Sequence, residues 1–187
     1  IRQESHEVKI WESVKSVSIL AMNLKCVRNS FLNSLSNHRN TTVFSEYSVM
    51  KIYLDIDGTM IHEDLTENYG KAAAGLEDFI IALRPYDTYW LTTHCTTGDP
   101  ANAVRIMKRV LPESLHPDID RIKGTIWTDM KTEALDWNTD FIWFDNDIFD
   151  AEWKVLEQCN ENQSVVQVDL RTNPEQLVEI TRDILNA

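Results

Sequence analysis

Short runs of apolar, β-prone residues alternate with helical patterns from residue 50 onward. The runs predict strands at 51–54, 88–91, 125–127, 141–144 and 165–168, and the patterns between them predict helices at about 72–83, about 100–110, 131–135 and 174–185. Because the strands are continuous apolar runs, we expect a parallel sheet that is buried on both faces by helices. The pattern predicts an α/β fold, a Rossmann-like three-layer sandwich with a central, mostly parallel five-stranded sheet.

Proline, aspartate and asparagine mark the predicted helix ends. Pro85 ends the first helix, and Asp99 is the expected N-cap of the second, with Pro100 at its first helical position. Asp129 is the expected cap of the third helix, and Asn173 that of the last. These signals predict where the chain enters each helix between two strands.

Carboxylate and hydroxyl side chains follow three of the predicted strands at the points where they end. They are Asp55, Asp57, Thr92, Thr93, Asp145 and Asp147. Parallel strands bring their carboxyl ends to one edge of a sheet, and ligands of open α/β sheets bind outside that edge. The sequence therefore predicts a binding site there.

The segment Asp55-Ile56-Asp57-Gly58-Thr59 is the most informative of these strand ends. Two carboxylates two residues apart, just past a buried strand, are costly to desolvate unless a cation joins them. Gly58 allows the chain to turn sharply behind them. An acidic strand–turn without a chemical role is the alternative for such a short string taken alone.

Four segments together resemble the motifs of the haloacid dehalogenase (HAD) superfamily. The first is the apolar strand 51–54 followed by DxDGT, and the second is Thr92 after an apolar strand. The third is Lys131 at a predicted helix start, and the fourth is the apolar strand 141–144 followed by Asp145. The motifs occur in the family's order over about 100 residues, so the combination is more specific than any one motif.

This resemblance implies a Mg²⁺-dependent phosphatase, a hydrolase that cleaves phosphomonoesters. Asp55 would be the nucleophile that forms an aspartyl-phosphate, and Asp57 would protonate the leaving oxygen and then activate water. Thr92 and Lys131 would complete the catalytic set by binding the phosphoryl oxygens. The expected phosphate-binding residues are Thr92, Thr93, Gly58 and Lys131.

The resemblance also implies a Mg²⁺ site built from oxygen ligands. Its expected ligands are Asp55, the backbone carbonyl of Asp57, and Asp145, with Asp147 or Asp150 in support. The chain departs from the family pattern here, because Asn146 interrupts the usual acidic pair and Phe144 stands where a Gly is common. The choice between the two supporting carboxylates therefore stays open.

Neighbouring residues compete for several of these roles. Side chains alternate along a strand, so a shift of one residue would replace Thr92 by Thr93, and the family register favours Thr92. Lys123 is a rival of Lys131 but is expected in the loop before the third strand. His94 either contacts substrate or lies on the surface.

Other reactive or aromatic residues have structural explanations. Cys95 has no base partner visible in the sequence, which argues against a thiol nucleophile. Trp90, Trp127 and Trp143 lie on predicted strands and are expected in the core.

The connections that carry substrate-selecting caps in HAD enzymes are short in this chain. Only 28 residues separate Thr59 from Thr88, and the segment from Lys131 to Phe141 is also tight. We expect a capless, open site suited to a bulky phosphorylated substrate, or to a cap lent by a partner chain. A phosphotransferase and a non-catalytic or regulatory HAD-like binding module are the alternatives, and neither the substrate nor the oligomeric state follows from the sequence.

The composition argues against several kinds of partner and indicates a cellular compartment. The net charge of −12 argues against a nucleic-acid partner, because phosphate contacts need Lys and Arg. The chain contains no run of about 18 uncharged apolar residues, so we expect no membrane-spanning helix. The three cysteines are widely spaced and show neither a disulfide framework nor a metal-type pair, so we expect a reducing, cytoplasmic setting.

The composition changes near Met50. Residues 1–49 carry six Lys or Arg and four Asp or Glu, whereas residues 50–187 carry twelve and twenty-six, and nine of the eleven serines precede Met50. We expect 50–187 to be the HAD-like catalytic domain and 1–49 an N-terminal extension, helical or poorly ordered and possibly not part of the domain. A partner-binding helix, from the stripe Ile10, Val14, Val17, Ala21 and Leu24, and a targeting segment are the alternatives.

Overall fold

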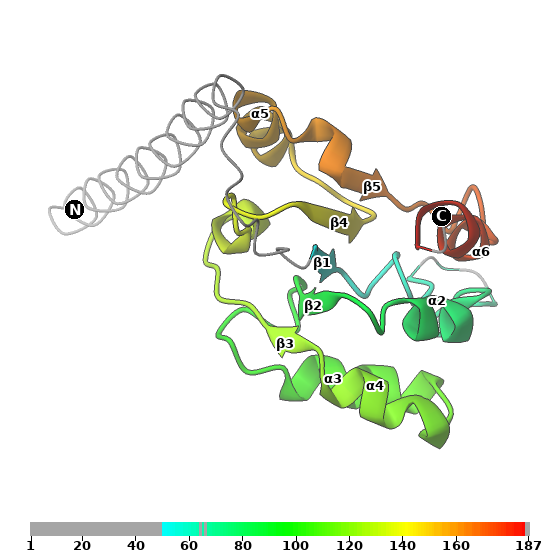
Figure 1. The fold of residues 1–187 in the computed structure, drawn as a ribbon. Helices are drawn as coiled ribbons and strands as arrows, with labels where there is room; N and C mark the ends of the chain where they lie inside the picture. Colours follow the sequence, from blue (N-terminus) through cyan, green and yellow to red (C-terminus); the bar gives the residue numbers. More distant parts are fainter. Residues whose placement is uncertain (1–49, 64, 66, 186–187) are drawn as a thin grey trace, which may run out of the picture.

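The computed structural model describes residues 50–63, 65 and 67–185 (Figure 1). The expectations for residues 1–49, including the helix stripe and the nature of the extension, lie outside the described residues. None of the helices in the described part of the chain has the length and hydropathy needed to traverse a lipid bilayer.

A five-stranded sheet forms the centre of the fold. Its strands are β1 (Lys51–Leu54), β2 (Asp87–Trp90), β3 (Lys123–Gly124), β4 (Phe141–Asp145) and β5 (Val165–Gln167). They lie in the order β3-β2-β1-β4-β5, and every neighbouring pair is parallel. The α/β fold predicted from the apolar runs is confirmed, and the sheet is parallel throughout.

Strand alternation divides the core between the two faces of the sheet. On β1, Ile52 and Leu54 belong to one buried cluster and Tyr53 to the other. On β4, Phe144 faces the first cluster, while Trp143 faces the second. Successive side chains of a strand point to opposite faces, so a sheet covered on both sides needs apolar residues at nearly every position.

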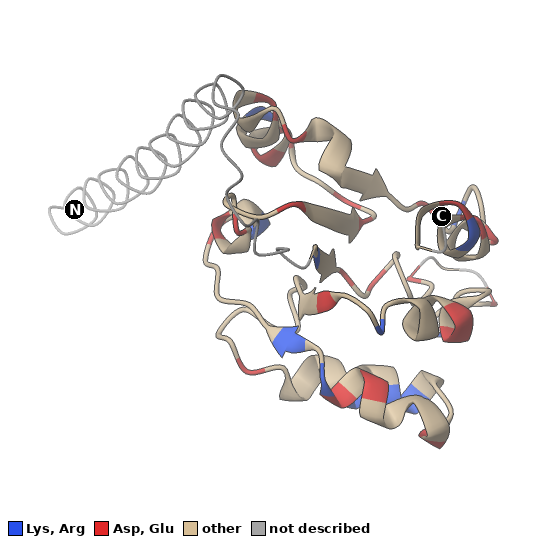
Figure 2. Ribbon diagram, viewed as in Figure 1, with Lys and Arg blue, Asp and Glu red and all other residues tan. Residues whose placement is uncertain are grey.

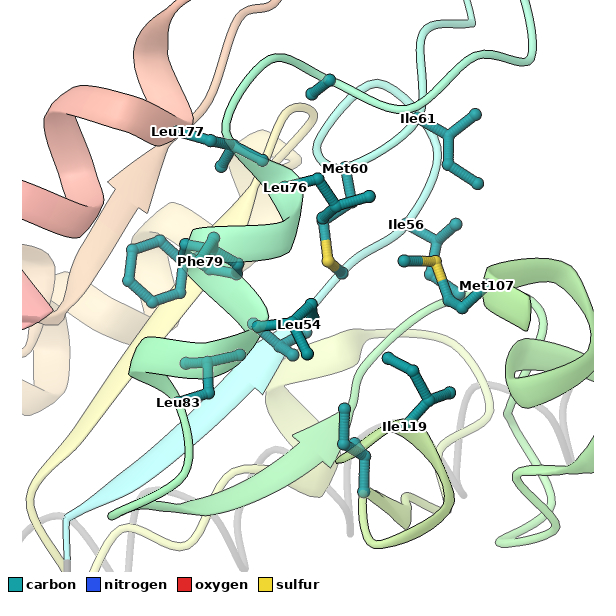
Figure 3. Close-up of a cluster of buried hydrophobic side chains, with 14 of the residues drawn as sticks. Leu54, Ile56, Met60, Ile61, Leu76, Phe79, Leu83, Met107, Ile119 and Leu177 are labelled. Atoms are coloured by element: carbon teal, nitrogen blue, oxygen red, sulfur yellow. The ribbon is translucent and has the colours of Figure 1, made fainter. Parts of the chain in front are cut away.

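Helices cover each of these faces. They are α2 (Leu76–Ala82), α3 (Ala101–Val110), α4 (His116–Asp120), α5 (Asp150–Cys159) and α6 (Gln176–Ile180), with short helices at Glu113–Leu115, Lys131–Ala134, Asn162–Ser164 and Thr181–Leu185. The first cluster contains buried side chains of α2, α3, α4 and α6 (Figure 3), whereas α5 and the helix Lys131–Ala134 contribute to the second. Figure 1 shows α2 and α6 on the opposite side of the sheet from α5, which completes the three layers.

The third strand lies two residues earlier than the sequence predicts. Gly124, the last residue of β3, approaches Gly98 so closely that a Cβ atom on it would lie 2.2 Å from the Gly98 carbonyl oxygen. Thr125 then leaves the ladder and donates its hydroxyl to the Trp90 carbonyl (2.6 Å), and Ile126 forms an antiparallel bridge with Thr97. Close backbone packing, rather than β-propensity, decides where this edge strand ends.

Helix starts follow the expected signals in part. Asp99 accepts a hydrogen bond from the Ala101 amide (2.9 Å), but Pro100 is the N-cap of α3, so the cap predicted at Asp99 lies one residue too early. The prediction that Asp129 caps the helix Lys131–Ala134 is wrong, because Met130 is its N-cap. Glu133 instead folds back, and its carboxylate accepts hydrogen bonds from the amide and hydroxyl of Thr128, at 2.9 and 2.8 Å.

The connection from β1 to β2 begins with a hairpin. Ile61 bridges Ala72 in antiparallel fashion, and the backbone amide of His62 donates to the Lys71 carbonyl at 3.0 Å. This pairing delays α2, which begins at Leu76 after Gly75 in the left-handed region (φ 74°), rather than at residue 72. The hairpin and α2 therefore occupy the short connection seen in the sequence.

Candidate active site

The candidate site lies where the strand order reverses. The chain passes outward from β1 to β2 and β3 and then returns to place β4 beside β1. Leu54 is in register with Phe144, and the Asp55 amide donates to the Phe144 carbonyl at 3.0 Å. Asp55 and Asp145 therefore lie side by side at the carboxyl ends of the two strands. Open α/β sheets bind ligands in the crevice at such a reversal.

Lys131 joins the two carboxylates. Its Nζ lies 3.1 Å from Asp55 Oδ1 and 2.6 Å from Asp145 Oδ2. The three side chains are nearly enclosed, with 12% of the lysine, 7% of Asp55 and none of Asp145 exposed. With both carboxylates ionised, one ammonium would leave a negative charge unbalanced, and such a buried charge is costly unless a proton or a further cation neutralises it.

Burial and mutual repulsion shift the pKa values of these groups. Burial is the main reason why the pKa of Asp55 lies above its ordinary value, although the Lys131 charge opposes the shift. Burial and the Asp55 charge raise the pKa of Asp145 to about 7. Burial alone would lower the pKa of Lys131, but the two carboxylates outweigh it and the net shift is upward.

Glu152 fixes the position of Lys131. This buried glutamate on α5 accepts a hydrogen bond from the Lys131 amide (2.6 Å) and another from the Phe149 amide (3.1 Å). The start of the helix Lys131–Ala134 is thereby tied to the start of α5. The sequence analysis did not identify Glu152, whose only sequence signal is an acidic residue in the first turn of a helix.

Two further donors orient the Asp145 carboxylate. Trp143 donates its indole N–H to Asp145 Oδ2 at 2.9 Å, and the Asp147 amide donates to Oδ1 at 3.0 Å. Trp143 is buried, as the sequence predicts, but it also serves the site. The side chains of Asp147 and Asp150 are exposed, so their supporting role as metal ligands stays a prediction.

Asp57 pairs with a histidine from the next strand end. His94 Nε2 lies 2.7 Å from Asp57 Oδ2, and His94 Nδ1 lies 3.3 Å from the side-chain amide nitrogen of Asn102 on α3. The Asp57 side chain is 43% exposed, so it remains accessible from solvent. The sequence analysis left His94 as a surface or substrate-contacting residue, because nothing in the sequence links it to a carboxylate 37 positions earlier.

Thr92 and Thr93 differ in burial. Thr92 is fully buried, and its hydroxyl oxygen accepts a hydrogen bond from the His94 amide at 3.4 Å, whereas Thr93 is exposed. This difference agrees with the register that favours Thr92, whose hydroxyl hydrogen stays available to another acceptor. The phosphate-binding roles of both threonines stay predictions.

Gly58 sits at a position that only glycine fits. Its φ is +72°, and a Cβ atom there would lie 2.2 Å from the Asn146 side-chain nitrogen. Asn146 in turn donates to Glu63 at 2.8 Å, and the Thr59 hydroxyl lies 3.5 Å from both Asp55 Oδ2 and Asn146 Oδ1. The turn after β1 is therefore held against the turn after β4, and the sequence analysis did not identify Asn146 or Glu63 as part of this contact.

The donor set suits a hard divalent cation. Asp55 and Asp145 offer carboxylate oxygens, the ligands that Mg²⁺ prefers, in a place with excess negative charge. Among the described residues, no group of three or more His, Cys, Asp or Glu side chains is arranged to hold a metal. The groups that would hold a Mg²⁺ ion, together with water, are the Asp55 and Asp145 carboxylates and the Asp57 carbonyl, and the ion would supply positive charge beside them. This metal site stays a prediction.

The rival residues lie away from this constellation. Lys123 belongs to β3 rather than to a loop, and its ammonium pairs with Asp87 at 2.5 Å, at the start of β2. Cys95 is a buried free thiol, and burial raises its pKa, which opposes a role as nucleophile.

Comparison with known proteins gives no match. No family model matches the chain, and neither the curated proteins nor the solved structures contain a significant match to it. The resemblance to the HAD superfamily therefore depends on the motifs and on the site described above.

Proposed function

We propose that this protein is a Mg²⁺-dependent phosphatase that cleaves a phosphomonoester through an aspartyl-phosphate on Asp55. The supporting observation is the Lys131 ammonium between Asp55 and Asp145, enclosed at the reversal of the strand order. An ion pair that served stability alone would gain little in such a buried place. The arrangement supports the proposal because the Lys131 ammonium, once released from the carboxylates, offers a cation to the phosphoryl oxygens.

The proposed reaction has two steps, and each is a displacement at phosphorus. In the first, a carboxylate oxygen of Asp55 attacks phosphorus and the bond to the leaving oxygen breaks, while Asp57 gives its proton to that oxygen. In the second, Asp57 takes a proton from water, which attacks the phosphorus of the aspartyl-phosphate and releases phosphate. His94, 2.7 Å from Asp57 Oδ2, keeps the Asp57 carboxyl directed toward the reacting oxygen.

Charge stabilisation comes from fixed groups. The Lys131 ammonium faces the phosphoryl oxygens once the ion pair opens, and the Thr92 hydroxyl donates to one of them. A Mg²⁺ ion, when bound, supplies further positive charge at the transferring group. Glu152 ties the Lys131 backbone to the start of α5, which fixes the point from which the lysine side chain reaches the phosphoryl oxygens.

Release of inorganic phosphate from a panel of phosphoesters, with Mg²⁺ or with chelator, tests this proposal. We expect Mg²⁺-dependent release by the wild type and background release by Asp55→Asn, which removes the attacking charge at nearly constant shape. Asp78→Asn on the exposed side of α2 is the matched control and should retain full activity.

The other outcomes separate the alternatives. Near-normal release by Asp55→Asn would exclude the covalent mechanism. Binding of Mg²⁺ without release from any ester would favour a non-catalytic binding module. Transfer of the phosphoryl group to an added alcohol in preference to water would favour a phosphotransferase.

A further inference from the structure

A small pocket opens beside Asp57, the residue to which the proposed function assigns protonation of the leaving oxygen. Its volume is about 220 Å³, and it lies between the hairpin after β1 and the C-terminal half of α3. Ile61, Ile106 and Val110 form its apolar wall. This volume is below the range of about 300–1,000 Å³ typical of drug-sized ligands, so the pocket suits a single substituted ring.

Tyr69 gives the pocket an aromatic wall. It lines the pocket from the hairpin, and 65% of its surface is exposed. A large aromatic side chain so exposed, in a pocket that α3 also lines, offers one face for stacking with a flat ligand. The pocket therefore favours a ring over a flexible chain.

Arg109 lines the pocket from α3 and is its cationic residue. Its guanidinium makes no hydrogen bond or ion pair with any residue that the structure describes, whereas Arg105 bonds to Asn102 and Lys108 pairs with Asp120 at 2.7 Å. The three basic residues share α3, whose sequence contains no acidic residue, in a chain with a net charge of −12. Figure 2 shows acidic residues on elements throughout the fold. An unpaired arginine at a pocket rim is suited to a ligand carboxylate or phosphate.

Charge also fixes the orientation of a ligand. Asp57 and Glu63 line the pocket from the turn and hairpin after β1, whereas Arg109 lines it from α3, and the two carboxylates would repel an anion placed beside them. A second anionic group on the leaving group would therefore lie toward Arg109, with the ring between Tyr69 and the apolar wall.

We propose that this pocket binds the leaving group, and that the substrates are phosphomonoesters of a hydroxyl-bearing aromatic ring that carries a second anionic group. This assignment depends on the proposed function, because it takes Asp57 to face the leaving oxygen. Tyr69 and Arg109 are then the residues that determine specificity, Tyr69 for the ring and Arg109 for the anion.

Two isosteric substrates test the proposal. We expect the wild type to prefer 4-carboxyphenyl phosphate over 4-carbamoylphenyl phosphate, which differ by one charge. Arg109→Gln should lower kcat/KM for the carboxylate about fivefold and leave the carboxamide within about twofold, as expected for a partly exposed ion pair. Tyr69→Ala should lower kcat/KM about tenfold for both aryl esters relative to ethyl phosphate. Arg182→Gln, an exposed arginine on the helix Thr181–Leu185, is the matched control and should change neither ratio.

A binding measurement separates this inference from the proposed function. Titration of the full chain with 4-hydroxybenzoate and 4-hydroxybenzamide, followed by NMR, requires no turnover. Weaker binding of the benzoate to Arg109→Gln, without phosphate release from any ester, would support the pocket and reject the phosphatase. Equal phosphate release from the carboxylate and carboxamide substrates, unchanged in Arg109→Gln and Tyr69→Ala, would support the phosphatase and overturn the pocket assignment.

Discussion

Replacement of Lys131 by Met tests whether the buried ion pair depends on charge. The substitution keeps most of the apolar stem and removes the ammonium that lies 3.1 Å from Asp55 and 2.6 Å from Asp145. Removal of one partner from a buried ionic cluster typically costs about 3–5 kcal/mol, because the remaining charges lose their compensation. For a domain of this size we expect the melting temperature at pH 8 to fall by roughly 10 °C.

The cost should depend on pH in a defined direction. Burial and the Asp55 charge already raise the pKa of Asp145 to about 7 in the folded protein, and loss of Lys131 raises it further. A carboxyl whose folded pKa is raised binds an extra proton in the folded state, so stability is lost as pH rises from the unfolded pKa through the folded one. For the wild type, the free energy of unfolding stops falling near pH 7, the folded pKa of Asp145. For the variant, it continues to fall above pH 7, by up to about 1.4 kcal/mol per pH unit.

Urea denaturation in chelator at pH 5, 7 and 8.5 measures this difference. We expect the free energy of unfolding of Lys131→Met to lie about 1 kcal/mol below the wild type at pH 5 and about 3–5 kcal/mol below it at pH 8.5. Lys154→Met, at an exposed position on α5, is the control and should have little effect at either pH. An equal cost for Lys131→Met at pH 5 and pH 8.5 would refute the argument, because lost packing would then explain it.

Three further changes have expected outcomes. Trp143→Phe removes the indole donor 2.9 Å from Asp145, so calorimetry should show weaker Mg²⁺ binding, and the free energy of unfolding should fall by about 1–3 kcal/mol; unchanged values would show that the hydrogen bond is dispensable. Burial would raise the pKa of Asp136, but the Lys51 ammonium and the hydrogen bonds from Asn138 together outweigh this and lower it to about 2, so Asp136→Asn should cost about 1 kcal/mol near pH 6. A depressed carboxyl pKa stabilises the fold above the unfolded value, so this difference should close as pH falls from about 4 to 2, and a constant difference would contradict it. A chain that begins at Met50 should melt as cooperatively as the full chain, whereas aggregation or a melting temperature lower by many degrees would place residues 1–49 in the core.

Local signals in the sequence were enough to predict most of the fold. Continuous apolar runs at 51–54 and 141–144 indicated the central parallel strands, because burial on both faces demands apolar residues at every position. Strand ends in a parallel sheet share one edge, so the strand pattern alone predicts that Asp55 and Asp145 lie together. Their contact with Lys131, from a segment 76 residues after Asp55, agrees with the order of the motifs.

Contacts set by packing could not be predicted. The Asp57–His94 pair depends on how the turns after β1 and β2 meet, and Glu152 reaches Lys131 only because α5 packs against the helix Lys131–Ala134. The displaced third strand has the same origin, since the close approach at Gly124 is invisible in a single sequence. The pocket beside Asp57 also joins a hairpin to α3, which are distant in the chain.

The covalent mechanism predicts a phosphoryl group on Asp55 during turnover, and this group can be detected directly. Asp57→Asn should still be attacked by a phosphoester with a good leaving group, which needs little protonation, but breakdown of the adduct should be slow because water lacks its base. Mass spectrometry of Asp57→Asn, quenched after mixing with 4-nitrophenyl phosphate and Mg²⁺, should find one added phosphoryl group, on the peptide that contains Asp55. The double variant Asp55→Asn/Asp57→Asn should show none. A phosphoryl group on another residue, or normal turnover by Asp55→Asn without any adduct, would contradict the account.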